Sequence, residues 1–166
     1  DTPIIKQMIE AGRKAGTGPM AAVAGAIAEA LFHSVKTPFR TLIIENGGDI
    51  FASSTEDLIC GLYTGSSFDK FALKIKKSLM PCGISSSSSK IGHSLSFGKA
   101  LLAVVISPSG ALSDAFATSL ANSVQSENDL ENAVNFCTAQ KGIIGCAAVI
   151  NDKIAFAGDI EFTELS

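Results

Sequence analysis

The sequence predicts an α+β fold in which an antiparallel sheet is backed by helices, and three observations support this prediction. Helical periodicity dominates the start of the chain and residues 112–139, and short apolar runs of strand length lie between them. The tetrapeptide Asn46–Asp49 joins two of these runs, and Asn-Gly between apolar runs is the strongest short-range signal of a β-hairpin. Strands joined by hairpin turns, with helices before and after them, are typical of an antiparallel sheet covered by helices on one face.

The first part of the chain predicts two helices. Residues 3–15 are amphipathic, with a proline at the first turn and apolar residues along one side. Gly16–Gly18 ends this helix, and a second helix begins near Pro19 and continues to Leu31. Almost all residues of the second helix are small, and small side chains let another backbone or a ligand come close.

The period changes to that of strands after residue 40. Beyond the hairpin, further apolar runs predict strands, and the Gly- and Ser-rich stretch 83–98 predicts a loop. Two more helices follow, and the chain closes on a second hairpin with its turn at Asn151 and Asp152. The predicted strands are 42–45, 50–52, 57–64, 69–75, 100–107, 147–150 and 153–156, and the predicted late helices are 112–123 and 128–139.

Composition narrows the class of protein. The 166 residues fit one domain, and apolar residues make up 46% of them, which is enough to fill a core. Charged residues make up only 17%, which indicates that a partner copy or a further segment covers part of the surface. We therefore expect a homo-oligomer. No apolar run reaches the length of a membrane span.

The charge pattern argues against a nucleic-acid partner. The net charge is −3, and no basic stripe follows any predicted element. The nearest group of basic residues lies between Lys70 and Lys77, and we interpret it as the solvated face of an edge strand.

The cysteines indicate the compartment. They stand at positions 60, 82, 137 and 146, without the CxxC or histidine spacing of a zinc site. Each lies in an apolar context, so we expect buried free thiols. Free thiols persist in a reducing environment, and the sequence therefore predicts a cytoplasmic protein.

Asp114 and Thr118 form the first candidate site. They are four residues apart in a predicted helix, so their side chains lie one turn apart on the same face. A carboxylate and a hydroxyl so placed offer two oxygens to a hard cation such as Mg²⁺, which takes few protein ligands and completes its shell with water and phosphate. The alternative is that Asp114 only complements the positive end of the helix.

Two glycine-containing segments are candidates for contact with a ligand. Gly47 and Gly48, followed by Asp49, permit positive φ and close approach to main-chain N–H groups, although an ordinary hairpin turn also explains them. The helix start at Gly16–Gly18 presents free N–H groups that can bind an anion.

The Ser- and Gly-rich stretch adds hydroxyls and an imidazole. Ser86 and Ser87 can donate to phosphate, and His93 is the better placed of the two histidines for proton transfer, because it lies in a polar segment. The alternative is a flexible surface loop without a chemical role.

Four segments in this order resemble an uncharacterised family of bacterial and archaeal ApbE-like proteins. They are Gly18–Glu29, Glu45–Ile50, Gly92–Gly98 and Ser113–Thr118. The resemblance covers most of the chain, and the four segments are specific together although each is short. Because members of that family are usually longer at the N-terminus, we expect residues 1–166 to form a single ApbE-like domain that lacks an N-terminal segment of the full-length protein.

The wider relatives are the ApbE flavin transferases, which use magnesium to move FMN from FAD onto a threonine of a target protein, and whose fold is tunnelling-fold-like. The resemblance implies that Asp114 and Thr118 hold the metal and that a carbonyl near Ala28 is a third metal contact. It also implies that the Gly47–Asp49 turn lies beside the flavin and that His93 acts in the catalytic loop.

The chain departs from the transferases at two places. Glu29 and Ala30 stand where the transferases have Lys-Gly, and Ser94–Ser96 follows the histidine where they have Asp-Pro. We therefore expect an ApbE-like protein that binds a flavin or another nucleotide or phosphate ligand with a divalent metal, and the resemblance implies FMN transfer as its activity. The alternative is a non-catalytic module that binds a small metabolite or serves oligomeric assembly.

Overall fold

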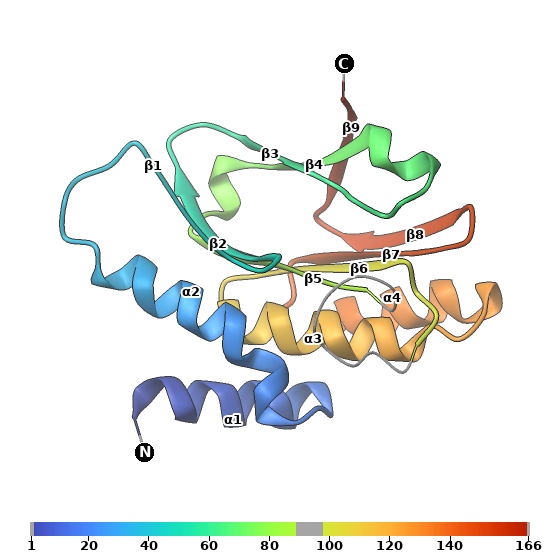
Figure 1. Ribbon diagram of the computed structural model, residues 1–166, viewed down its shortest axis with the longest axis horizontal. Coiled ribbons are helices and arrows are strands. Elements are labelled where there is room, and N and C mark those ends of the chain that lie inside the picture. The colour runs from blue at the N-terminus through green and yellow to red at the C-terminus, as the bar shows by residue number, and fades with distance from the viewer. Residues whose placement is uncertain (1, 89–97, 166) are drawn as a thin grey trace.

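The computed structural model describes residues 2–88 and 98–165, and Figure 1 shows how the helices and strands are arranged. The α-helices are α1 (Pro3–Ala15), α2 (Val23–Ser34), α3 (Gly110–Ser123) and α4 (Leu130–Thr138). The 3-10 turns are η1 (Pro19–Ala22), η2 (Ser67–Lys70), η3 (Lys77–Leu79) and η4 (Glu127–Asp129). The strands are β1 (Thr41–Asn46), β2 (Asp49–Ser54), β3 (Leu58–Gly61), β4 (Phe71–Ile75), β5 (Cys82–Ser87), β6 (Leu102–Ser107), β7 (Gly145–Ile150), β8 (Lys153–Gly158) and β9 (Glu161–Glu164).

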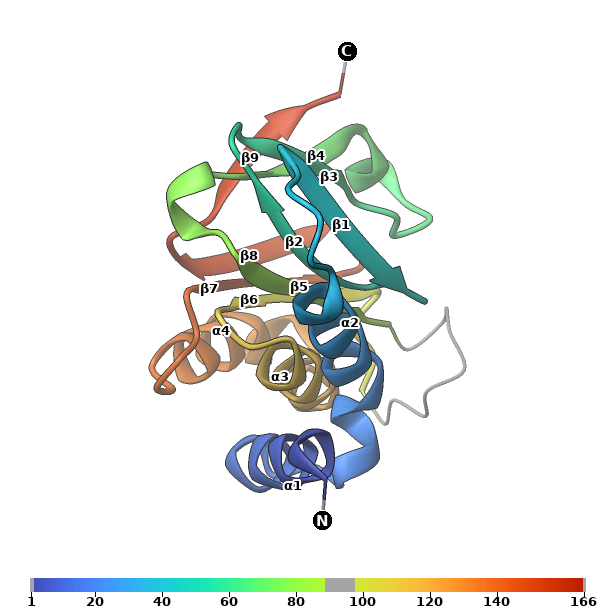
Figure 2. The same cartoon turned by 90° about the vertical axis from the view of Figure 1, so that its left-hand side faces the viewer.

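The strands form two antiparallel sheets. One has six strands in the order β1-β2-β5-β6-β7-β8, and the other has three in the order β3-β4-β9. The helices cover one face of the six-stranded sheet and the three-stranded sheet lies over its other face, while α1 lies farthest from the sheet, beneath α2 and α3 (Figure 2). The predicted α+β fold with an antiparallel sheet backed by helices is confirmed, but the sequence pattern did not show that the strands divide between two sheets.

The central strands β6 and β7 of the six-stranded sheet are buried on both faces, and β6 shows how. Ala103 and Val105 face the helices, whereas Leu102, Val104 and Ile106 face the three-stranded sheet. Both sets are buried, which explains why this strand is a continuous apolar run in the sequence. The small residues lie on the helix side, so the helices come close to the sheet.

One strand occupies part of the stretch that the sequence assigns to a loop. β5 runs from Cys82 to Ser87 between β2 and β6, so the loop prediction is wrong up to residue 87, and positions 89–97 of that prediction lie outside the described residues. The strand escapes detection because serines replace the apolar residues of a normal core strand. Ser85 is fully buried, and its hydroxyl is hydrogen-bonded to that of Ser113 at 2.8 Å, which satisfies a polar group inside the core.

The lysines between positions 70 and 77 do not mark an edge strand, contrary to the prediction. β4 is the central strand of its sheet, and Lys74 of β4 and Lys76 just after it form ion pairs with acids of neighbouring segments. Lys74 pairs with Asp57 and Glu161, and Lys76 pairs with Asp159 and Glu161. The group is thus balanced by acidic residues on the surface.

Helices α2 and α3 touch backbone to backbone at one glycine pair. A Cβ added at Gly25 would overlap the carbonyl oxygen of Gly110 and would lie 2.9 Å from the Cβ of Asp114. Every residue from Gly110 to Ala117 is buried, so α3 is the central helix of the fold. The run of small residues in α2 therefore serves close helix packing, and this packing sets the position of Asp114.

Glu29 of α2 holds the start of α3. Its Oε2 accepts hydrogen bonds from the main-chain N–H of Gly110 at 2.8 Å and from the hydroxyl of Ser109 at 3.2 Å. A carboxylate at this place satisfies otherwise unpaired donors and complements the positive helix end. The glutamate that departs from the transferase pattern thus has a structural role here.

We expect Glu29→Ala to lower the free energy of unfolding by about 2 kcal/mol, because it leaves a buried main-chain N–H without an acceptor. Urea denaturation of the purified chain measures the change. Glu10→Ala is the matched control in α1, since the Glu10 carboxylate is exposed and forms a surface ion pair with Lys14 one turn away. Equal stability of the two variants would contradict the assigned role.

Within residues 2–88 and 98–165, no single helix is long and apolar enough to cross a membrane. The segments Pro3–Ala15 and Pro19–Ser34 meet the length and composition criteria only when taken together, and they are bent by 108°.

Candidate functional site

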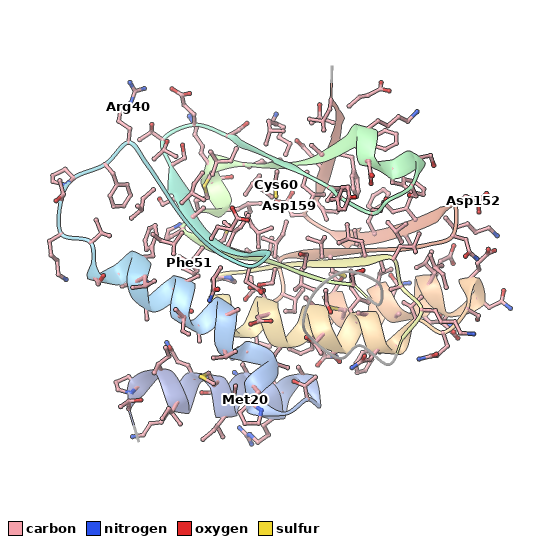
Figure 3. All side chains as sticks on the ribbon, in the orientation of Figure 1. Met20, Arg40, Phe51, Cys60, Asp152 and Asp159 are labelled. Carbon is pink, nitrogen blue, oxygen red and sulfur yellow. The ribbon has the colours of Figure 1, made fainter. Side chains whose placement is uncertain are left out.

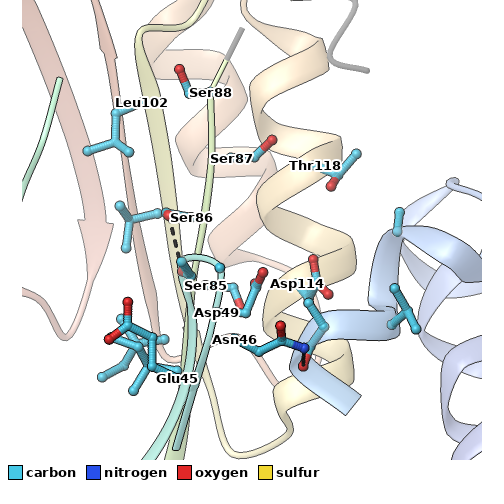
Figure 4. Close-up of a pocket in the computed structure, with 18 of the residues that line it drawn as sticks. Glu45, Asn46, Asp49, Ser85, Ser86, Ser87, Ser88, Leu102, Asp114 and Thr118 are labelled. Atoms are coloured by element: carbon cyan, nitrogen blue, oxygen red, sulfur yellow. Dashed lines mark hydrogen bonds between the residues drawn. The ribbon is translucent and has the colours of Figure 1, made fainter. Parts of the chain in front are cut away.

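A cavity of about 1150 Å³ opens at the tip of the β1–β2 hairpin and reaches both faces of the six-stranded sheet (Figure 4). Its two parts meet where the hairpin ends, because β2 pairs with β5 only as far as Ser85 while β5 continues to Ser87. We call the part beneath the sheet the α3 lobe; it is lined by Asp49, Ser85, Ser87, Asp114 and Thr118. We call the part between the two sheets the inter-sheet lobe; it is lined by Leu62, Leu73, Ile84, Leu102 and Val104.

The α3 lobe brings two buried carboxyl groups side by side. Asp49 is the first residue of β2, and Asp114 lies in the second turn of α3. Only 8% of the surface of Asp49 and 9% of that of Asp114 is exposed. The main-chain N–H of Gly25 donates to Oδ2 of Asp114 at 3.0 Å. Oδ1 of Asp49 is buried and has no hydrogen-bond partner among the described residues. Unpaired buried carboxylate oxygens are costly, so this arrangement calls for a proton or a cation.

Burial dominates the protonation of this pair. Loss of solvent raises the pKa of Asp49 to about 6, although the hydroxyl of Ser85 opposes the shift. Loss of solvent also raises the pKa of Asp114 to about 7; the negative charge of Asp49 adds to this effect, and the N–H of Gly25 opposes it. Without a cation, the two carboxyl groups therefore hold protons at a pH where ordinary aspartates are ionised.

These raised pKa values predict that the metal-free protein loses stability as the pH rises. Between about pH 4 and about pH 7 the folded chain retains protons that the unfolded chain releases, so the free energy of unfolding falls across that range. We expect a loss of about 2 kcal/mol in chelator-treated protein between about pH 5 and about pH 7.5. Thermal unfolding at each pH measures it.

Asp114→Asn is the comparison that isolates this effect, because the amide cannot titrate. The variant should show a clearly flatter stability profile over the same pH range. The exposed acids with lowered pKa, such as Asp57 and Asp129, titrate below this range and leave it undisturbed. A profile with the same slope in both proteins would contradict the assignment.

The oxygen donors around the pair fit a hard divalent cation. Asp49 and Asp114 supply carboxylate oxygens, Thr118 supplies a hydroxyl one turn further along α3, and the carbonyl of Ala24 lies close enough to accept from the side chain of Asn46 at 3.4 Å. Oxygen-only donors suit Mg²⁺, which keeps several waters or ligand phosphates in its shell. Among the described residues no three His, Cys, Asp or Glu side chains group together, so the donor set does not suit Zn²⁺.

The cavity has no lysine or arginine in its described lining. Its charged residues are all acidic, namely Glu45, Asp49 and Asp114. An anionic ligand would meet the carboxylate of Glu45 and, wherever Asp49 and Asp114 are ionised, their charges as well, unless a cation lay between them. The charge of the lining therefore disfavours an anion that arrives without a cation.

The predicted hairpin turn reaches the cavity. Gly47 and Gly48 adopt φ of 68° and 116°, which only glycine takes without strain, and both line the cavity. The carbonyl of Gly48 accepts from the N–H of Ser86 at 3.2 Å and from its hydroxyl at 3.1 Å, so the turn is tied to β5. Ser87 also lines the cavity, and its buried hydroxyl has no partner within the described part of the chain.

One predicted residue, Ala28, does not line the cavity. Ala28 is fully buried against Phe32 and Phe51, one helical turn from the cavity, and Ala24 takes its place in the lining. Phe51 belongs to β2 of the hairpin, and its side chain packs against α2 (Figure 3). His93 lies outside the described residues. The metal and catalytic roles of both stay predictions.

The structure adds residues that the sequence analysis did not assign. Asn122 lines the cavity and lies one turn beyond Thr118. Asp114, Thr118 and Asn122 are four residues apart, so the helical spacing could have predicted that Asn122 lies on the same face of α3. Asn46 and the main-chain N–H of Gly25 also lie at the site, where they bond to the carbonyl of Ala24 and to Asp114. Both bonds depend on the close packing of α2, which the sequence does not reveal. Gly16–Gly18, predicted as an anion-binding helix start, does line the cavity.

The fold is that of an ApbE-like α+β protein. The crystal structure of the Pseudomonas stutzeri flavinyl transferase ApbE, in its apo form, matches with a TM-score of 0.55 and 13% sequence identity. The match covers 85% of this chain and 47% of the transferase, so it establishes a shared fold over about half of that protein.

The family follows from sequence. The model of the family described as AbpE bacteria matches residues 1–150, and the chain belongs to that family. A UPF0280 protein from Methanocaldococcus jannaschii is 39% identical over 96% of this chain and 68% of its own length. A UPF0280 protein from Methanothrix thermoacetophila is 39% identical over 95% of this chain and 67% of its own length, and one from Methanococcus vannielii is 41% identical over 84% and 58%. The chain therefore spans about two thirds of the length of these relatives. The resemblance to an ApbE-like family is confirmed.

Proposed function

We propose that the protein binds a flavin or another nucleotide through its phosphates, and that a divalent cation, most suitably Mg²⁺, holds those phosphates in the α3 lobe. The observation that carries the proposal is the charge of the cavity: Asp49 and Asp114 are buried together, and the described lining contains no basic residue. Such a site attracts a cation first, and the bound cation then attracts phosphate.

Named residues have distinct roles in this proposal. Asp49 and Asp114 hold the cation, and Thr118 adds a hydroxyl. The Gly47–Gly48 turn and the free hydroxyl of Ser87 approach the phosphate oxygens as hydrogen-bond donors. When bound, Mg²⁺ would neutralise phosphate charge, which is the contribution that phosphoryl and nucleotidyl transfer require. FMN transfer is the catalytic form of this proposal, and the structural neighbour is a flavinyl transferase.

Thermal unfolding with FAD, FMN and ATP, each with and without Mg²⁺, tests the proposal. We expect each stabilising ligand to act only when Mg²⁺ is present, and Mg²⁺ alone to stabilise the protein more weakly than the combination. A ligand that stabilises equally in chelator would overturn the metal-dependent site. If no ligand shifts the unfolding temperature under either condition, the non-catalytic assembly module becomes the better account.

A further inference from the structure

The large apolar side chains that stay exposed are concentrated at the start of the chain. Thirteen are exposed among the described residues, and seven of these lie within residues 5–39. Apolar surface gathered in this way marks an interaction site on a globular protein. Of the seven, only Met20 lines the cavity, so this surface is separate from the proposed ligand site.

Helix α2 carries the centre of this apolar surface. Val23, Ile27 and Leu31 recur every four residues along the helix, and Val35 continues the spacing just after its last residue. We call these four residues the α2 stripe. Residues at this spacing follow one another along one side of a helix. Leu31 is 52% exposed, whereas Phe32, on another side of the helix, is buried against the hairpin.

The exposed side of α2 carries no charged side chain. Glu29 is the only Asp, Glu, Lys or Arg of the helix, and its carboxylate is turned inward onto the start of α3. Only 12% of the Glu29 side chain is exposed. A helix that is apolar on its outer side as well as on its inner side is normally covered by another part of the protein or by a partner. The outer side of α2 is therefore expected to be an interface.

The neighbouring segments extend the apolar surface beyond α2. Helix α1 lies beneath α2 in both views (Figures 1 and 2), and its Ile5 and Ile9 are exposed one turn apart. Phe39, which follows α2, is also exposed, and its ring contacts that of Phe32. A stable interface buries about 800 Å² on each partner and takes about 20 to 30 residues from each. The 12 residues of α2 do not suffice alone, but together with α1 and residues 35–39 they offer a surface of that order.

We propose that the α2 stripe packs against the same stripe of a second copy of this chain, with the two copies related by a two-fold axis and their α2 helices antiparallel. Ile27 of each copy then meets Leu31 of the other, because a two-fold interface brings one surface against itself. Ridges of residues spaced four apart interdigitate in the commonest class of helix packing.

The absence of charge favours a second copy over an unlike partner. Each copy has a net charge of −3, so two copies approach one another best through a face without charge. Unlike partners are commonly selected through complementary charge, and the outer side of α2 offers none. Homodimer interfaces are also more apolar than interfaces between transient partners.

Sedimentation velocity of the purified chain, in chelator and without nucleotide, tests the proposal. We expect the wild-type protein to be a dimer at about 100 μM, with a Kd in the micromolar range or below. Leu31→Lys places a charge from each copy in the apolar interface and should raise the Kd at least about hundredfold, so that the variant is a monomer. Phe136→Lys is the matched control, because Phe136 is an exposed apolar residue of a different helix, α4, and this variant should remain a dimer.

Each result supports or overturns the proposal. A monomeric wild-type protein would overturn it and leave the outer side of α2 to a different partner. A dimer that persists in Leu31→Lys would place the interface elsewhere. Should Leu31→Lys fail to fold, cross-linking of Ala30→Cys with a bismaleimide decides, since Ala30 is exposed beside the stripe. A covalent dimer absent from the equally treated wild type supports the proposal, and its absence from both overturns it. Because metal and nucleotide are left out, none of these results bears on the proposed function.

Discussion

We expect Asp114→Asn to abolish the proposed Mg²⁺-dependent stabilisation of the protein by nucleotide while the fold persists. The amide is nearly isosteric but lacks the charge that draws the cation into the α3 lobe beside Asp49. A ligand at about 100 times its Kd stabilises a protein by about 2.7 kcal/mol, and we expect the variant to lose all of this. Thermal unfolding with and without Mg²⁺ and FAD measures the loss, and titration of Mg²⁺ alone should show at least about tenfold weaker binding.

The metal-free stability of the same variant separates a lost site from a damaged fold. Removing one of two adjacent buried carboxyl groups relieves their repulsion, so metal-free Asp114→Asn should be at least as stable as the wild type at about pH 7.5. Asp152→Asn, in the exposed β7–β8 turn, is the matched control and should keep the full response to metal and nucleotide. Retention of the Mg²⁺-dependent response in Asp114→Asn would remove the basis of the proposed function.

Gly25→Ala should destabilise the protein by about 3 kcal/mol or more, although alanine is the better helix former. Propensity alone would make this change stabilising by about 1 kcal/mol. The added Cβ, however, overlaps the carbonyl of Gly110 and crowds Asp114, and neither backbone can yield without moving a buried helix. Urea denaturation measures the change in the free energy of unfolding.

Gly61→Ala is the control for this substitution. Among the described residues, no heavy atom beyond those of Gly61 and its two chain neighbours lies within 4 Å of a Cβ built there. Its φ is not positive either, so the change should be neutral or slightly stabilising. A stable Gly25→Ala protein would mean that α2 and α3 can separate, and then the hydrogen bond from Gly25 to Asp114 would not fix the carboxylate. Whether Gly25→Ala lowers or raises the free energy of unfolding therefore tests how rigidly α2 and α3 hold the α3 lobe of the cavity.

The sequence predicted the parts of this fold that local patterns determine. Helical periodicity gave α1 with both ends correct, and Asn-Gly-Gly-Asp gave the β1–β2 hairpin, because these signals depend on neighbours in the chain. The sequence did not predict the polar strand β5 or the short strand β9. It therefore did not predict the division of the strands into two sheets either. Their pairing depends on contacts between distant segments, which no local period records.

In the candidate site, too, the sequence predicted what depends on local spacing and missed what depends on contacts between distant segments. The spacing of Asp114 and Thr118 predicted that both oxygens face one way, and both line the cavity. The pairing of Asp114 with Asp49 could not be predicted, because it depends on the depth at which α3 packs against the sheet. The metal itself, the nucleotide, the role of His93, the homo-oligomer and the cytoplasmic location stay predictions.

Strand β5 has a consequence for how this family can vary. Ser85 and Ser87 point toward α3, whereas Ile84 and Ser86 point the opposite way, so alternate positions of one short strand contribute to two separate chemical environments. Substitution at the even-numbered positions would change the lining on the inter-sheet side without changing the groups that line the α3 lobe. Insertion of a single residue would exchange the two sets, so strand length should be far more constrained than side-chain identity.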